Sequence, residues 1–211
     1  MWKQVMPGVF EGIPGEQHQE PELLYVKLSN IPIGTMKTHR LETWQHKSSE
    51  PWWPKIAQYA DGSYIHPFVT FFGTVGTGKT HMTFAIGWAW LERSRTVLYY
   101  QVENLLDALR RGYSSWQKGD TDGYSTILEF AKNANLLILD DFGAQHETEW
   151  AASKLDQIVD YRYIHKKPLI ATTNLALDRL PARIADRLSE GVLVQLTGES
   201  FRKQAKVSDK V

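Results

Sequence analysis

The sequence predicts an α/β fold: a three-layer domain around a mostly parallel five-stranded sheet. Three observations predict it. Segments rich in β-branched and aromatic residues alternate with longer segments whose apolar residues recur at helical spacing, as in a sheet covered by helices. The first clear strand runs directly into Gly73–Thr80, a G-x-x-x-x-G-K-T loop that requires a strand before it and a helix after it. Two aspartates end a run of four apolar residues at Leu136–Leu139, which indicates a central strand buried on both faces.

The bulk composition limits the class of protein. The 211 residues are enough for one sizeable α/β core. The formal net charge of +0 produces no global basic field, so any contact with nucleic acid must come from a local patch. Without cysteine the chain has no disulfides or thiolate zinc sites. No apolar run approaches a membrane span and the first residues do not form a signal peptide, so we expect a soluble cytoplasmic protein.

The elements are expected in the following order. Residues 1–30 form an irregular arm, because glycine and proline interrupt them, and Leu23–Val26 alone could pack or form a short strand. Residues 31–206 form the domain, and residues 207–211 are a polar tail. Strands are expected at 68–72, 96–100, 136–139, 168–174 and 192–196, where β-forming residues gather. Helices are expected after the glycine-rich loop and at 55–60, 103–112, 125–133, 147–165 and 182–188, with a polar loop at 112–123.

The glycine-rich loop indicates phosphate binding. Its glycines let the backbone approach a phosphate, and successive N–H groups then point at it from the positive end of the next helix. Lys79 adds a point charge at the β- and γ-phosphate oxygens, and the Thr80 hydroxyl is a ligand for Mg²⁺. A plain glycine-rich turn is the alternative. The expected nucleotide-binding residues are Gly73, Thr74, Val75, Gly76, Thr77, Gly78, Lys79, Thr80 and His81.

Polar residues at the ends of two strands complete the expected site. Two acids after a buried strand cost free energy unless they serve a site. Beside a phosphate-binding loop, Asp140 is expected to hold Mg²⁺, directly or through water, and Asp141 to orient the water that attacks the γ-phosphate. Asn174 ends the fourth strand at the same carboxyl edge, where ligands bind, and could reach the γ-phosphate or the water. Capping of the following turn or helix is the alternative for Asp141 and Asn174.

Several motifs together resemble one family. In order and spacing they are similar to those of the AAA+ ATPases of the DnaC/DnaI helicase-loader and IstB-like group, over about Ile31–Lys203. The resemblance implies an ATP-hydrolysing AAA+ domain of the ASCE type, and because only nine residues follow Arg202 we expect no C-terminal lid domain. The motifs are GTVGTGKTHM at 73–82, LLILDDFG at 136–143, ATTN at 171–174, RIADRL at 183–188 and TGESFR at 197–202.

The resemblance also implies roles that the residues alone do not indicate. These roles are sensor 1 at Asn174, the arginine finger at Arg187 and sensor 2 at Arg202. An arginine finger in this family completes the ATP site of a neighbouring subunit, which implies a homo-oligomer with shared sites. From the residues alone, Arg183 and Arg187 would form a solvated helix face paired with Asp186 or Glu190.

A helix after the second strand contacts single-stranded DNA in related initiators and loaders. The resemblance assigns this role to Glu103–Gly112 and the residues that follow. Cations beside stacking surfaces are what sequence-tolerant binding of single strands needs. An ordinary helix end is the alternative. The implied DNA-binding residues are Arg110, Arg111, Tyr113 and Lys118, with Trp116 beside them.

The function that these features favour is that of a DNA-replication ATPase. It would bind ATP with Mg²⁺, oligomerise on single-stranded DNA and help to place a replicative helicase. Loaders usually carry an N-terminal helicase-binding domain, so here a short arm would dock the helicase, or the docking element is reduced or missing. The alternatives are an IstB-like transposition helper that acts with a transposase, a P-loop small-molecule kinase, and a DNA-binding module that hardly hydrolyses ATP because Asp141 is short. The adenine pocket stays unassigned, with residues 31–43 as its expected region.

Overall fold

The computed structural model describes residues 2–6, 9–12, 21–44, 50–117, 123–143, 148–198 and 200–201. Five strands form one sheet in the order β4-β5-β6-β3-β7, and every neighbouring pair is parallel. The strands are β3 (Phe68–Phe72), β4 (Val97–Gln101), β5 (Leu136–Phe142), β6 (Leu169–Thr173) and β7 (Val192–Gln195). The predicted α/β fold is therefore confirmed, with a sheet that is entirely parallel.

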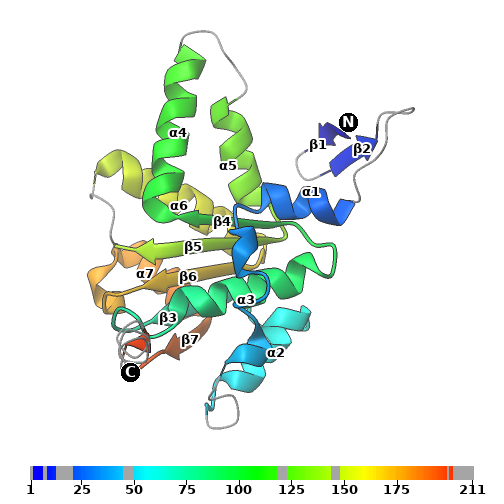
Figure 1. Ribbon diagram of the computed structural model, residues 1–211. Helices are drawn as coiled ribbons and strands as arrows, with labels where there is room; N and C mark the ends of the chain where they lie inside the picture. Colours follow the sequence, from blue (N-terminus) through cyan, green and yellow to red (C-terminus); the bar gives the residue numbers. More distant parts are fainter. Residues whose placement is uncertain are drawn as a thin grey trace, which may run out of the picture.

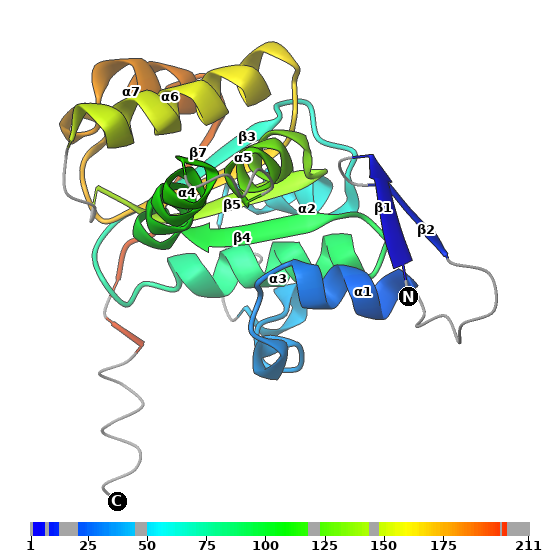
Figure 2. The ribbon, with the colours of Figure 1, turned by 90° about the horizontal axis from the view of Figure 1, so that it is seen from above.

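Helices cover both faces of this sheet (Figures 1 and 2). Figure 2 shows α6 and α7 on one side of the sheet and α3 with α1 on the other. Neighbouring residues of β5 point to opposite faces, so Leu137 packs with α4 to α7 while Ile138 packs with α2 and α3. The helices are α1 (Pro21–Leu28), α2 (Trp53–Asp61), α3 (Lys79–Leu91), α4 (Val102–Gln117), α5 (Gly123–Asn133), α6 (Glu149–Ile164) and α7 (Ala182–Ser189).

Two expectations for local structure are wrong. α4 continues to Gln117, where the sequence predicts a polar loop from Gly112 onward. A glycine inside a helix costs only about 1 kcal/mol, and Gly112 is buried in the helical pair that α4 forms with α5, which projects from the sheet (Figure 1). Packing between the two helices therefore overrides the local signal.

The second correction concerns the expected irregular arm. Its described residues form an antiparallel pair, β1 (Trp2–Met6) with β2 (Val9–Gly12), followed by helix α1. Of the two alternatives for Leu23–Val26, a short strand is wrong, and packing is confirmed for Tyr25 and Val26. Tyr25 of α1 packs against the core on the α3 side, and the carbonyl oxygen of Ser29 accepts a hydrogen bond of 2.8 Å from the backbone N–H of Tyr99. The segment after α1 is thereby joined to the edge strand β4.

Arg162 is a charged member of the core. Its place on the apolar stripe of α6 predicts a core-facing position, and its side chain is 0% exposed. The guanidinium donates to the carbonyl oxygens of Ala131 (2.9 Å), Lys132 (3.0 Å) and Ala134 (2.9 Å) at the end of α5, and to Pro168 (2.5 Å) before β6. Burial lowers the pKa of Arg162 to about 10. Arg162 thus caps α5 and joins it to the start of β6.

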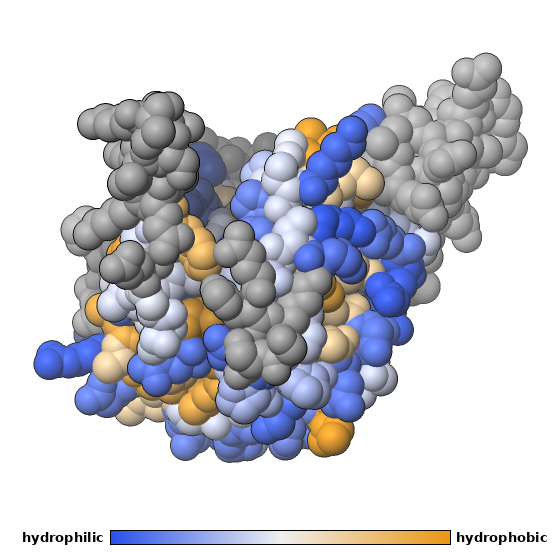
Figure 3. All heavy atoms as spheres, turned by 60° about the horizontal axis from the view of Figure 1, so that its bottom comes forward, coloured by the Kyte–Doolittle hydropathy of each residue, from blue (hydrophilic) through white to orange (hydrophobic). Residues whose placement is uncertain are grey.

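The surface is of mixed polarity. On the face shown in Figure 3, small apolar areas lie among hydrophilic side chains. None of the helices in the described ranges has the length and apolar character that crossing a membrane requires.

Candidate functional site

The candidate site is a cleft of about 530 Å³ at the carboxyl edge of the sheet. The loop between β3 and α3 forms one wall, and the ends of β5 and β6 form another. Because β6 lies between β3 and β5 in the sheet, its last residues stand between the glycine-rich loop and the two aspartates. The strand order therefore brings together three motifs that are far apart in the sequence.

The glycine-rich loop has the conformation that phosphate binding needs. Gly73, Gly76 and Gly78 have φ angles of 139°, 87° and 92°, which side-chain-bearing residues rarely adopt. A Cβ atom on Gly78 would lie 2.7 Å from the ring of Trp44. The ammonium of Lys79 donates to the carbonyl oxygens of Gly73 (2.8 Å) and Thr74 (2.7 Å). These bonds hold the charge of Lys79 at the mouth of the loop, where a phosphate would enter.

Asp140 is held by three hydroxyl groups. Its Oδ2 accepts hydrogen bonds of 3.0 Å from Thr80 and from Tyr99, and its Oδ1 accepts one of 2.5 Å from Thr172. The residue is only 3% exposed. Carboxylate and hydroxyl oxygens are ligands that Mg²⁺ takes, usually together with water and substrate phosphates. Asp140 and Thr80, which lie in contact beside the phosphate-binding loop, therefore fit this ion.

The electrostatic surroundings of Tyr99 reflect this arrangement. Its burial, and then the charge of the neighbouring Asp140 carboxylate, raise the pKa of the Tyr99 phenol well above its usual value. The phenol, which is protonated at neutral pH in any case, keeps its proton to higher pH and donates its hydrogen bond to Asp140.

Asp141 and Asn174 form a pair at the open side of the cleft. The side-chain amide of Asn174 donates to Oδ1 of Asp141 over 2.7 Å. Asp141 has a φ of 64°, a conformation that costs a non-glycine residue roughly 1–2 kcal/mol. The N-cap of α6 is Thr148, and the Thr173 hydroxyl accepts a hydrogen bond from the N–H of Leu175, so other residues make these two capping bonds.

Aromatic rings and histidines close the other side of the cleft. The rings of His39 and His81 stack with their centroids 4.7 Å apart, and the ring of Trp44 lies 5.9 Å from His81 and 6.1 Å from Phe201. Burial lowers the pKa of both histidines, so the wall is uncharged at neutral pH. A flat, uncharged wall beside a phosphate loop can stack on a nucleotide base.

Arg187 lies outside the lining of the cleft. It forms ion pairs with Asp160 (3.5 Å), Asp186 (3.2 Å) and Glu190 (3.7 Å), and its guanidinium lies 4.3 Å from the ring centroid of Tyr163. The paired helix face that the residues alone suggest is therefore present. A role for Arg187 at the nucleotide of another subunit stays a prediction, and Arg202 lies outside the described residues.

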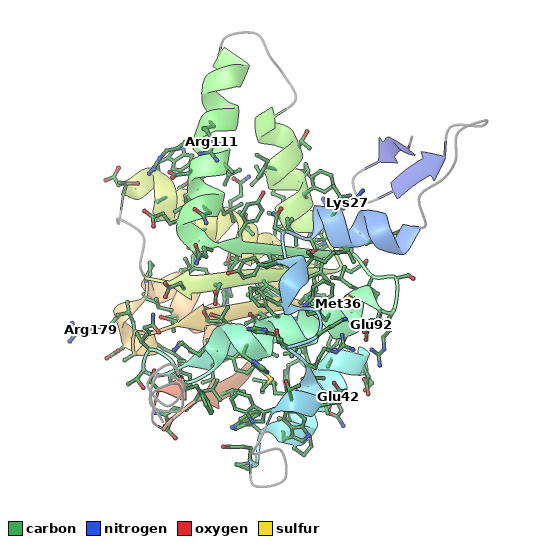
Figure 4. All side chains as sticks on the ribbon, viewed as in Figure 1. Lys27, Met36, Glu42, Glu92, Arg111 and Arg179 are labelled. Carbon is green, nitrogen blue, oxygen red and sulfur yellow. The ribbon has the colours of Figure 1, made fainter. Side chains whose placement is uncertain are left out.

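Arg110 and Arg111, two of the residues expected to bind DNA, differ in their surroundings. Arg110 pairs with Asp107 over 3.2 Å and its guanidinium lies 5.0 Å from the ring centroid of Trp150. Arg111 is exposed on α4 (Figure 4). The side chains of Tyr113 and Trp116, and the whole of Lys118, lie outside the part of the chain that the structure describes.

Sequence reasoning missed several residues of the site. Tyr99 carries only the signal of a strand-forming residue, and Thr172 only that of a polar residue within ATTN. Their contacts with Asp140 depend on β4 and β6 lying on either side of β5. Of the aromatic wall, Trp44 and Phe201 were missed, whereas His81 was an expected nucleotide-binding residue and His39 lies in the expected region 31–43.

Comparisons with known proteins agree with this geometry. A family model described as IstB-like ATP binding protein matches residues 36–209. The chain is 30% identical over 139 residues to the replicative helicase loader DnaC of Escherichia coli K12, which covers 64% of this chain and 54% of the loader. It is 35% identical over 104 residues to a Mycobacterium tuberculosis protein described as ATP-binding and located in an insertion sequence, covering 49% of this chain and 39% of that protein. The chain spans about half the length or less of these relatives.

Solved structures share the fold. The crystal structure of the DnaC helicase loader has a TM-score of 0.60 at 22% identity and covers 77% of this chain and 98% of its own. The crystal structure of DnaI has a TM-score of 0.62 at 20% identity and covers 86% of this chain and 99% of its own. The replication initiator DnaA bound to AMPPCP and single-stranded DNA has a TM-score of 0.64 at 21% identity, with coverage of 81% and 55%. At these identities the likeness shows the fold alone.

Proposed function

The chain belongs to the family of IstB-like ATP binding proteins, as the match over residues 36–209 shows, and we propose that it is an ATPase that assists the loading of a replicative helicase. The shared fold and the relatives, a replicative helicase loader and an ATP-binding protein in an insertion sequence, support a role in replication or transposition. Hydrolysis, binding of single-stranded DNA and oligomerisation are the finer parts of the proposal.

One observation carries the ATPase proposal: the loop with Lys79, the Thr80–Asp140 pair and the Asp141–Asn174 pair converge on one cleft. The loop N–H groups and Lys79 would bind the β- and γ-phosphates. Thr80 and Asp140 would hold Mg²⁺, which when bound neutralises charge on the phosphates.

Asp141 and its hydrogen-bond partner Asn174 would position the attacking water. Asp141 would accept a hydrogen bond from the attacking water and polarise it toward the γ-phosphate. Asn174 would keep the Asp141 carboxylate in one orientation through the bond of 2.7 Å. From its position directly after β6 it would also reach the γ-phosphate. The aromatic wall with Trp44 and His81 would take the adenine base.

Arg187 is proposed to act on the ATP of a neighbouring subunit, and Arg202 on the ATP of its own. In the single chain Arg187 is neutralised by three carboxylates, so assembly would have to draw it away from them. An arginine finger is worth on the order of 10³–10⁵ in rate where it has been measured. Hydrolysis by an isolated subunit would therefore be slow.

Contact with single-stranded DNA is proposed for α4. The helix projects from the sheet with α5 (Figure 1), and Arg111 is exposed on it. One solved structure of the same fold, DnaA, holds single-stranded DNA. Residues 31–206 would be the ATPase domain, 1–30 the arm that docks a helicase, and 207–211 a tail. The cytoplasmic location stays a prediction.

The test is steady-state phosphate release from ATP over a range of protein concentrations, with and without single-stranded DNA. The proposal predicts a rate per subunit that rises with concentration and responds to the DNA. Arg187→Ala should abolish this rise and keep nucleotide binding. Arg183→Ala is the matched control, because Arg183 lies on the same helix and shares Asp160. Normal hydrolysis by the Arg187 variant would refute the shared site.

The second candidate is a transposition helper, which the family match and the insertion-sequence relative favour. It would use the same cleft and act on duplex DNA with a transposase. A preference for duplex over single-stranded DNA, and capture of a transposase instead of a helicase, would favour it. Transfer of phosphate to a small acceptor would instead indicate a kinase.

A further inference from the structure

Tyr99 lies on β4, beside the strand that carries both aspartates. In the sheet β4 pairs with β5, and Gln101 is opposite Asp140. Tyr99 stands two residues earlier on the same face of β4 and reaches along the strand, so that its hydroxyl lies 3.0 Å from Oδ2 of Asp140. The contact is therefore between side chains of adjacent strands.

The Tyr99 hydroxyl donates a hydrogen bond that the buried Asp140 carboxylate cannot obtain from solvent. Asp140 is 3% exposed, so its oxygens depend on protein donors. Oδ2 has two donors, Thr80 and Tyr99. In the proposed function the Thr80 oxygen serves Mg²⁺, which leaves Tyr99 as the protein donor to Oδ2 while Thr172 holds Oδ1.

Tyr99 is itself held in place. Its ring meets the ring of Phe84 edge-on, with centroids 4.8 Å apart. Its backbone N–H donates to Ser29, which ties this point of the edge strand to the segment after α1. A donor fixed on both sides can define the orientation of the group it bonds.

We propose that Tyr99 is a positioning residue that orients the Asp140 carboxylate for Mg²⁺-dependent binding of ATP. The inference rests on the proposed function, because it concerns the same cleft. Tyr99 is not among the described residues that line the cleft. It acts only through Asp140.

The experiment compares Tyr99→Phe with Tyr100→Phe in the full chain. The first variant removes one hydroxyl and keeps the ring that packs on Phe84. The second removes the hydroxyl of the next residue, which points to the opposite face of the sheet and packs beside α4 and α5. Binding of a fluorescent, non-hydrolysable ATP analogue is titrated in EDTA and at increasing Mg²⁺ concentrations.

For Tyr99→Phe, the Mg²⁺ concentration that gives half of the gain in affinity should rise about tenfold, the lower end of the effect of removing partners of metal ligands. Affinity in EDTA and the melting temperature should match those of Tyr100→Phe. The rate of phosphate release at saturating Mg²⁺ should be largely recovered, which a merely structural defect would not allow.

Two results would overturn the inference. One is an unchanged Mg²⁺ dependence in Tyr99→Phe, and the other is an equal shift in both tyrosine variants. A wild-type chain that binds no nucleotide with Mg²⁺ would refute the proposed function, and the inference with it. The wild-type arm therefore separates the two failures.

Discussion

Replacement of Arg162 by methionine tests whether one buried side chain secures the base of the α4–α5 pair. The guanidinium makes four hydrogen bonds to carbonyl oxygens, three at the end of α5 and one at Pro168. Methionine fills much of the same volume but donates no hydrogen bond. The variant therefore removes the cap and keeps most of the packing.

The expected loss follows from the number of carbonyl groups left without a donor. Each buried polar group without a partner costs about 1–3 kcal/mol, and removal of the buried charge returns part of this. With four carbonyl oxygens affected and part of the cost returned, we expect the free energy of unfolding to fall by about 3–5 kcal/mol. At about 2–4 °C per kcal/mol for a chain of this size, the melting temperature should fall by about 6–20 °C.

Urea unfolding followed by circular dichroism measures this change directly. Arg93→Met is the matched control, because Arg93 is exposed and its side chain donates to one carbonyl, that of Ala89 (2.7 Å). The control should change stability by less than about 0.5 kcal/mol. A loss of less than about 1 kcal/mol for Arg162→Met would show that the cap is not needed.

Three further predictions concern the cleft and the projecting helix. Burial lowers the pKa of His81, so the folded chain binds fewer protons than the unfolded chain and its stability should fall as pH drops from about 7 to 5. The melting temperature should depend less steeply on pH for His81→Gln than for the wild type. Equal dependence in the two proteins would contradict a lowered pKa of His81. Asn174→Ala removes the donor to Asp141 and should lower the rate of phosphate release about 10- to 100-fold while affinity for ATP is kept; a loss of affinity alone would point to binding instead. Arg111→Ala should weaken binding of single-stranded DNA and reduce its salt slope by about 0.7, and Arg110→Ala should do less because Arg110 is already paired, as salt titrations of both would show.

Local patterns predicted most of the fold. Phe68–Phe72 was located to the residue. The other strands of the sheet and the helices of the expected domain were located to within about two residues, except for the ends of α4 and of β5, which continues to Phe142. Alternation and helical spacing can be found in the sequence because they are properties of neighbouring residues. The end of α4 at Gln117 was not predicted, since the packing of α5 decides it. The helix α1 was missed because its stability comes from contacts with the core.

Some residues of the candidate site could also be predicted from the sequence, whereas the contacts between them could not. The glycine-rich loop, Asp140, Asp141 and Asn174 can be found in the sequence, because a phosphate-binding turn needs glycines at set positions and strand ends carry the polar groups. The pairing of Asn174 with Asp141, and the hydroxyl donors to Asp140, could not be found there. They depend on which strands become neighbours.

The sequence by itself determined that the chain is an α/β protein with a phosphate-binding loop, since turn chemistry and hydrophobic periodicity are local. Only the tertiary structure decided which side chains hold the two aspartates and which rings form the wall of the cleft. The physical reason is that β6 lies between β3 and β5, while β4 closes the edge of the sheet beside β5. Tyr99 and Thr172 thereby meet Asp140 from opposite sides, 41 and 32 residues away in sequence.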